Sequence, residues 1–93
     1  MKIKKGISLE EENGEAILFD RESLLTAWLN ETSILIWKDL REGKNSEAIT
    51  LHLQEIYQDL SPEEAQEDVR MILKSFQQYG FIEDDKNLKS PVD

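Results

Sequence analysis

The sequence contains no cysteine, only two prolines and only four glycines. Without thiols, the chain has neither a disulfide framework nor a thiolate metal site. It also lacks any apolar run near the ~18 residues that a membrane-spanning helix needs. The basic start at Lys2, Lys4 and Lys5 is not followed by the apolar region that a signal peptide has. These absences predict a cytoplasmic protein.

Basic residues are scarce as well: 11 Lys and Arg residues stand against 20 Asp and Glu residues, which gives a formal net charge of −9. Affinity for nucleic acids rests largely on Lys and Arg side chains that replace the counterions of the phosphates. The same charge opposes binding to anionic membranes. We therefore expect neither nucleic acid nor membrane as a partner, which leaves peptides, proteins and small molecules.

The chain of 93 residues allows one domain with one modest core, to which 39% hydrophobic residues can contribute. We expect this single domain to cover residues 1–84. From Glu83 onward the sequence is polar and contains Pro91, which predicts a flexible C-terminal tail over residues 85–93.

The first thirty residues have the pattern of β-strands. Apolar residues alternate with polar or small ones at Ile3, Ile7 and Leu9. Asn13-Gly14 is a strong hairpin signal, and a second apolar run follows it at residues 16–19. A third apolar run covers residues 24–29. Three sequential strands with short connections predict an antiparallel meander.

The hydrophobic period changes at Asn30, a favoured helix N-cap. Apolar side chains then recur at the spacing of a helix, at Ile36, Trp37 and Leu40, and Gly43 marks the end. Further apolar residues at positions 34 and 35 make this helix apolar on more than one side. Such a helix is expected to lie between the sheet and the later helices.

Two more helices follow. The second is predicted from Ser46, with its apolar face at Ile49, Leu53, Ile56 and Tyr57. The third starts at Ser61-Pro62-Glu63-Glu64, a capping box with proline at the first helical position, and ends at Gly80. The chain then returns to the core in a short extended piece. We therefore predict an α+β fold with a winged-helix-like plan, a three-stranded antiparallel sheet followed by three helices.

No pattern of catalysis is present. The single histidine, His52, has no neighbouring nucleophile or orienting acid in any known motif. The acidic runs at residues 10–12 and 83–85 lack the alternating ligands and central glycine of a calcium loop, and the glycines form no phosphate-binding cluster. The sequence therefore predicts no enzyme activity, no metal site and no cofactor.

The third predicted strand raises a different question. In a meander its outer edge has unpaired backbone groups, and residues 24–29 contain no charge or proline to protect it. Such an edge is either an aggregation hazard or a docking site for an extended peptide. Alternation places Leu24 and Trp28 on the face opposite Leu25, Ala27 and Leu29, so Trp28 either packs with the second strand or contacts a ligand. These alternatives stay open from the residues alone.

Part of the chain resembles a known family. Leu29-Asn30-Glu31-Thr32-Ser33, followed by Ile36-Trp37 and Leu40, is similar to the "LNETA..IW..L" signature of PqqD-like proteins. A weaker hydrophobic pattern continues to Gly80-Phe81-Ile82, where the family usually has Gly-Leu. The resemblance covers roughly residues 14 to 84.

This resemblance implies a fold and a function. PqqD-like proteins are winged-helix-like precursor-peptide recognition elements, which bind the leader of a ribosomally made peptide and present it to a modifying enzyme. They are peptide chaperones in natural product biosynthesis. The enzyme is a radical S-adenosylmethionine enzyme or, in the similar lasso-peptide proteins, a leader peptidase. The precursor and the pathway, whether to a quinone cofactor, a lasso peptide or another product, stay open.

In that family the leader adds as a strand to the third strand and rests against the third helix. Carried onto this sequence, the resemblance implies a peptide-binding site made of Leu24, Leu25, Thr26, Ala27 and Trp28 on the strand and Gln66, Arg70, Leu73, Lys74 and Gln77 on the helix.

Two other functions fit a three-helix plan. A winged-helix DNA-binding regulator is opposed by the net charge and by the acidic residues at the start of the third helix, namely Glu63, Glu64, Glu67 and Asp68. A docking subunit that only stabilises an enzyme would bind that enzyme and ignore any leader.

Overall fold

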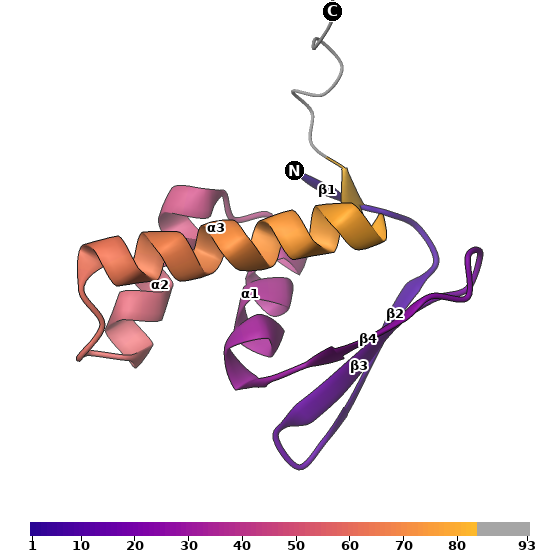
Figure 1. Cartoon of the computed structure of the whole chain (residues 1–93), viewed down its shortest axis with the longest axis horizontal. Helices are drawn as coiled ribbons and strands as arrows, with labels where there is room; N and C mark the ends of the chain where they lie inside the picture. The colour runs from indigo at the N-terminus through magenta and orange to yellow at the C-terminus, as the bar shows by residue number, and fades with distance from the viewer. Residues whose placement is uncertain (84–93) are drawn as a thin grey trace, which may run out of the picture.

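The computed structural model describes residues 1–83, which form five strands and three helices (Figure 1). The strands are β1 (Lys2–Ile3), β2 (Ile7–Glu12), β3 (Glu15–Asp20), β4 (Thr26–Leu29) and β5 (Ile82–Glu83). The helices are α1 (Glu31–Arg41), α2 (Ser46–Ile56) and α3 (Pro62–Tyr79). The predicted α+β class is confirmed. The predicted tail over residues 85–93 lies outside the described residues.

β2, β3 and β4 form an antiparallel sheet in that order. Glu12 lies opposite Glu15, so Asn13 and Gly14 alone connect β2 to β3. Their φ angles, 56° and 81°, are both positive, as a two-residue turn of the favoured type I′ requires. Figure 1 shows this hairpin projecting away from the helices. The meander predicted from the sequence is confirmed.

The predicted first strand is wrong in its extent. Lys2–Ile3 form the separate strand β1, in which Ile3 lies opposite Ile82 of β5. Gly6 has a φ of 85°, which interrupts an extended chain and which glycine adopts at little steric cost. The apolar residues Ile3 of β1 and Ile7 and Leu9 of β2 all occupy odd-numbered positions. The alternation in the sequence therefore continues across this break.

The third strand begins later than predicted. β4 starts at Thr26, whereas Leu24 has a φ of 69° and belongs to the turn that follows β3. The N–H of Leu24 donates to the carbonyl of Asp20 at 2.7 Å, and the N–H of Leu25 donates to Ser23 Oγ at 3.3 Å. The bulky apolar residues favour a strand locally, but these bonds hold the segment as a turn.

The helix boundaries follow their capping residues. Asn30 Oδ1 accepts the N–H of Ser33 at the start of α1, and Asn45 caps α2 in the same way. Ser61 opens α3 with both hydrogen bonds of a capping box, and Gly80 closes it with a φ of 81°. The predicted starts at Asn30 and Ser61 and the end at Gly80 are confirmed.

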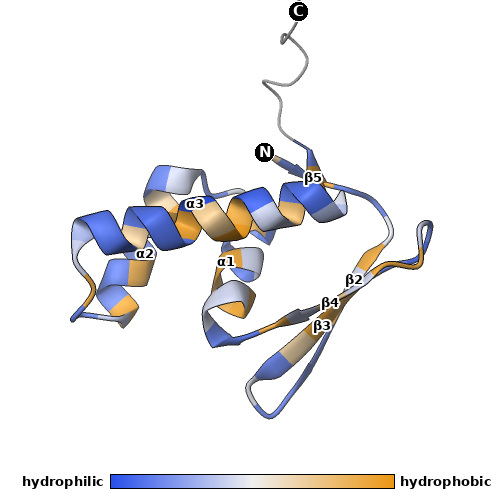
Figure 2. Cartoon of the chain, viewed as in Figure 1, coloured by the Kyte–Doolittle hydropathy of each residue, from blue (hydrophilic) through white to orange (hydrophobic). Residues whose placement is uncertain are grey.

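The core lies where α1 is enclosed by the sheet and the other helices. α1 contacts β3 and β4 on one side and α2 and α3 on the other, as predicted for a helix that is apolar on more than one side. Trp37 of α1 is 2% exposed and meets Phe76 of α3 edge-on, with 5.3 Å between ring centroids. Figure 2 shows hydrophobic and hydrophilic segments alternating along α3, as an amphipathic helix requires.

One predicted core residue is exposed. Ile56, the last residue of α2, faces solvent, while Tyr57 and Leu60 beyond it pack against the core. Within residues 1–83, none of the helices combines the length and the apolar character that a membrane crossing demands.

Candidate functional site

β4 is an edge strand of the described sheet, and the hydrogen-bond pattern shows which of its backbone groups are free. The N–H of Asp20 donates to the carbonyl of Leu25 at 2.9 Å. Residues of an antiparallel strand alternate between bonding to the partner and pointing away from it. Ala27, which lies opposite Leu18, is therefore the next residue of β4 that bonds to β3.

The remaining residues of β4 point the other way. Thr26 lies opposite Phe19 and Trp28 opposite Ile17, so both occupy positions that do not bond to β3. Each directs one N–H and one C=O to the open edge. These four backbone groups can extend the sheet by one more strand.

Apolar side chains lie along this edge. Trp28 is 71% exposed on the sheet face that points away from the helices, and Ile17 beside it is half-buried. Leu24 is 68% exposed, and Leu25 is also exposed. Ala27 is buried, as the predicted alternation requires. The edge therefore offers both an unpaired backbone and exposed apolar surface.

A small pocket of about 130 Å³ separates β4 from α3. We call it the strand–helix pocket. Residues of β4, α1 and α3 line it: Ala27, Trp28, Leu29, Ser33, Ile72, Ser75, Phe76 and Tyr79. The ring of Tyr79 stacks on Phe81 at 5.3 Å, which fixes the end of this wall. A strand added to β4 would have this flank of α3 beside it.

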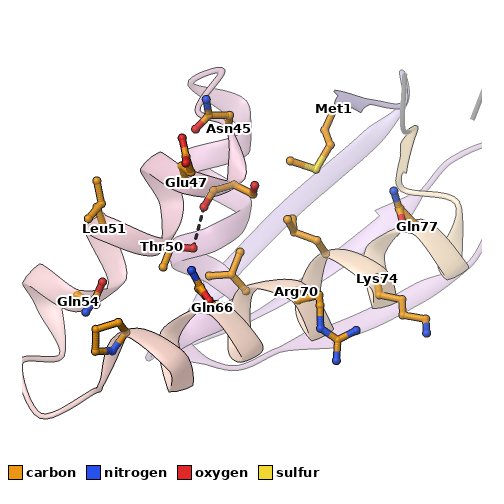
Figure 3. A pocket seen from close by; sticks show the side chains of 14 residues that line it. Met1, Asn45, Glu47, Thr50, Leu51, Gln54, Gln66, Arg70, Lys74 and Gln77 are labelled. Carbon is orange, nitrogen blue, oxygen red and sulfur yellow. Dashed lines mark hydrogen bonds between the residues drawn. The ribbon is translucent and has the colours of Figure 1, made fainter. Parts of the chain in front are cut away.

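The residues of α3 that were predicted to contact a peptide lie elsewhere. Gln66, Arg70, Leu73, Lys74 and Gln77 all line a larger groove of about 1290 Å³ between α2 and α3 (Figure 3). At 3.6 residues per turn, this flank of α3 lies roughly 160° around the helix from Ser75 and Tyr79. Leu73 is moreover 8% exposed and part of the core. The structure thus separates the strand half and the helix half of the predicted site.

Sequence comparison assigns the family. A family model described as "Coenzyme PQQ synthesis protein D (PqqD)" matches residues 15–82, which is most of the chain. The chain belongs to the PqqD family. The match includes residues 29–33, which resemble the family signature. Among curated proteins, none shows significant sequence similarity to this PqqD-family chain.

Solved structures share the fold. TbiB1, in a complex with the TbiA(beta) leader peptide, superposes with a TM-score of 0.82 at 23% identity, over 89% of this chain and 95% of its own. A lasso peptide synthetase B1 complexed with its leader peptide gives a TM-score of 0.80 at 22% identity, over 89% and 96% of the two chains. At such identities, the likeness establishes the fold of this PqqD-family member.

The turn before β4 is held by the buried carboxylate of Asp20. Asp20 Oδ2 accepts from Lys4 Nζ at 2.8 Å, and Oδ1 accepts the N–H of Glu22 at 2.9 Å and that of Ser23 at 3.3 Å. The Lys4 ammonium, helped by these N–H groups, holds the pKa of Asp20 well below its ordinary value although burial opposes this. Leu24 and Leu25, two residues of the predicted peptide site, follow Ser23 in this turn, so Asp20 positions them.

A second buried carboxylate, Asp39, forms a network that has no signal in the sequence. Its Oδ2 lies 2.7 Å from His52 Nδ1, and its Oδ1 accepts from Lys44 Nζ at 3.1 Å. Asp39 raises the pKa of Lys44. The network joins the end of α1 to α2, and no hydroxyl group bonds to His52 among the described residues. Its geometry therefore serves packing of the two helices.

The described part of the chain offers no metal centre, because residues 1–83 contain no group of three or more His, Asp or Glu side chains placed to hold an ion. The open edge of β4 and the strand–helix pocket are the features of this PqqD-family fold that suit an extended peptide.

Proposed function

We propose that this PqqD-family chain is a non-catalytic peptide chaperone. It binds the leader segment of a ribosomally synthesised precursor peptide as an additional strand on β4, and it presents that precursor to a modifying enzyme in the cytoplasm. The enzyme is of the radical S-adenosylmethionine type or a leader peptidase. The observation that carries this proposal is the open edge of β4, at which Thr26 and Trp28 direct their backbone groups outward.

The edge suits an extended peptide for a physical reason. Two residues of β4 offer two donors and two acceptors, which the backbone of an extended peptide can satisfy. The strand–helix pocket beside the edge would accept a side chain of the same peptide, and alternate side chains give such an interaction its selectivity. Leu24 and Leu25 would extend the contact with apolar surface at one end.

The comparisons support the same function. The chain belongs to the PqqD family, and two proteins of the same fold are described in complexes with leader peptides. On this proposal Leu24, Leu25, Thr26, Ala27 and Trp28 form the strand side of the site. Ile72, Ser75 and Tyr79 replace the helix residues implied by the resemblance, since they line the pocket next to β4.

The test is a proline at an outward-pointing position. Thr26→Pro removes an N–H that the described sheet does not use, at the first residue of a strand, where proline is tolerated. We expect leader affinity to fall by about tenfold or more, because one ladder bond is lost and the ring obstructs the added strand. The probes are synthetic peptides that match the leader segments of short precursor peptides encoded by the host, and their binding is measured by fluorescence anisotropy.

The control is Glu11→Pro on the opposite edge of the same sheet. Arg21 donates its N–H to the carbonyl of Gly6 at 3.0 Å, and by the same alternation Glu11 points its N–H away from β3. This variant should bind the leader as the wild type does. Loss of binding in Glu11→Pro, with Thr26→Pro unaffected, would show that the leader adds to β2 and that the proposal is wrong.

A further inference from the structure

The large groove between α2 and α3 is not used by the function proposed above. Its volume of about 1290 Å³ exceeds the ~300–1,000 Å³ of typical small-molecule sites. It lies on the flank of α3 that faces away from β4, so a leader strand on β4 would leave it open. Figure 3 shows side chains from both helices surrounding it.

The floor of the groove is apolar. Val69 and Leu73 of α3 lie at its base but are only 2% and 8% exposed, whereas Leu51 of α2 is 63% exposed along its wall. The hydroxyl of Thr50, also on that wall, donates to the carbonyl of Ser46 at 2.8 Å (Figure 3), so its donor is already used within α2. An occupant therefore gains from burying apolar side chains here.

The helical walls of the groove favour an occupant that is itself a helix. Both are α-helices, whose backbone groups bond within the helix and offer no edge to a strand. An extended peptide in this groove would find no strand edge to pair with its own N–H and C=O groups. A helix satisfies those groups itself and is the form of peptide that such grooves bind.

The rim of the groove selects the charge of its occupant. Arg70 and Lys74 stand one turn apart on the α3 rim, and Glu47 lies on α2 at the rim. Arg70 pairs with Glu67 at 2.7 Å, but both side chains are exposed, and an exposed pair of this kind is easily exchanged. Lys74 has no ion-pair partner within residues 1–83. Carboxylates facing α3 would complement this rim.

We propose that the α2–α3 groove binds an amphipathic helix of a partner protein, with an apolar stripe against the exposed Leu51 and acidic residues facing Arg70 and Lys74. This interface is separate from the leader edge, so the chain holds an extended peptide on one flank of α3 and a helix on the other. The inference goes beyond the function proposed above and does not require it.

The probes are two synthetic helical peptides of about 14 residues, a length at which an isolated helix begins to form. They share one leucine stripe and differ only in having glutamate or lysine beside it. Amide shifts of the labelled full-length protein map the site, and anisotropy measures affinity. We expect the glutamate peptide to shift the α2–α3 groove and to bind about fivefold or more tightly than the lysine peptide.

Two variants change the groove, and two controls leave it unchanged. Arg70→Glu/Lys74→Glu should reverse the preference between the two peptides, and Leu51→Gln should weaken both. Lys5→Glu/Arg21→Glu changes the net charge by the same amount at exposed positions outside the groove, and it should keep the preference of the wild type. Thr26→Pro should also keep it, which separates this site from the leader edge.

Several results would overturn the proposal. These are failure of both peptides to bind, equal binding of both, shifts centred on β4, or equal effects of the two charge reversals. Sedimentation of a dimer that Leu51→Gln dissociates would make the groove an interface between two copies. Binding of the glutamate peptide only by a chain that ends at residue 83 would make residues 84–93 its occupant. Either outcome contradicts a partner helix.

Discussion

The ammonium group of Lys4 lies 2.8 Å from Asp20 Oδ2 and thereby joins the segment between β1 and β2 to the turn between β3 and β4. The backbone N–H of Lys4 also donates to the carbonyl of Phe81 at 2.9 Å. Lys4 thus connects the end of α3 to the turn that precedes the candidate docking strand. Asp20 itself is 1% exposed, so this ion pair is largely shielded on the carboxylate side.

The substitution Asp20→Asn should make the free energy of unfolding less dependent on pH in the acidic range. The pKa of Asp20 is lowered by Lys4, so in the folded state this carboxylate stays charged below the ordinary Asp value of ~3.9. Its stabilising contribution is present above that value and is lost as pH falls toward the lower folded-state pKa. We expect Asp20→Asn to be less stable than the wild type at neutral pH, with a difference that shrinks below about pH 4. Urea unfolding followed by circular dichroism at a series of pH values measures this.

Glu22→Gln is the matched control for that experiment. Glu22 also contacts Lys4, at 3.0 Å, but it is exposed to solvent, where ion pairs contribute little. This variant should follow the pH dependence of the wild type. A stability difference for Asp20→Asn that is constant from neutral pH to strong acid would contradict the role of its charge.

Leu24→Gly should stabilise the fold. A left-handed conformation costs a non-glycine residue about 1–2 kcal/mol, and glycine relieves it but loses about 0.5–1 kcal/mol in chain entropy. Since the side chain of Leu24 is exposed, we expect the free energy of unfolding to rise by about 0.5–1 kcal/mol. The comparison is Leu25→Gly, where φ is not positive and glycine should destabilise. Equal losses of stability in both variants would show that the conformation of Leu24 is unstrained.

Leader binding should be visible in the fluorescence of Trp28 alone. Trp28 is exposed whereas Trp37 is in the core, so iodide should quench mainly Trp28 in the free protein. A strand added to β4 would cover Trp28 and reduce the quenching. In Trp28→Phe the leader should cause almost no change. A leader that binds without protecting Trp28 from iodide would place its site away from this edge.

The two flanks of α3 can be distinguished by one pair of substitutions. Ser75 lines the strand–helix pocket and Gln66 lines the α2–α3 groove, and both are exposed positions of the same helix. Ser75→Phe should fill the pocket and weaken leader binding, while Gln66→Phe should leave it unchanged. Thermal unfolding first establishes that both variants fold. If Gln66→Phe weakened leader binding and Ser75→Phe did not, the leader would contact the helix residues that the family resemblance implied.

The sequence predicted those elements whose signals are local. The turn at Asn13-Gly14, the cap at Asn30 and the capping box at Ser61 each depend on bonds within a few residues, and all three are confirmed. The family signature around residues 29–33 lies in the same well-determined region. Its residues join β4 directly to α1, and the match to the family model includes them.

The predictions from sequence failed where contacts between residues far apart in the chain determine the local structure. β1 and β2 look like one strand until β5 is known to pair with Ile3. Leu24 looks like part of a strand until Asp20 is seen to hold the turn. The side of α3 that faces β4 depends on how α1 and α2 pack beneath it, and Arg70 and Lys74 lie on the other flank, along the α2–α3 groove. The contact between His52 and Asp39 joins two helices and has no sequence signal.

The pairing of β1 with β5 has a consequence for how the protein folds. The two hairpins of the β2-β3-β4 sheet and the contact between α2 and α3 join segments that are neighbours in sequence, so they can form quickly. Only the ladder between Lys2 and Glu83 closes the whole described chain into a ring. Its loop is long, and a long loop costs more entropy to close. We therefore expect this ladder to form after the transition state, so that weakening it would accelerate unfolding and leave the rate of folding almost unchanged.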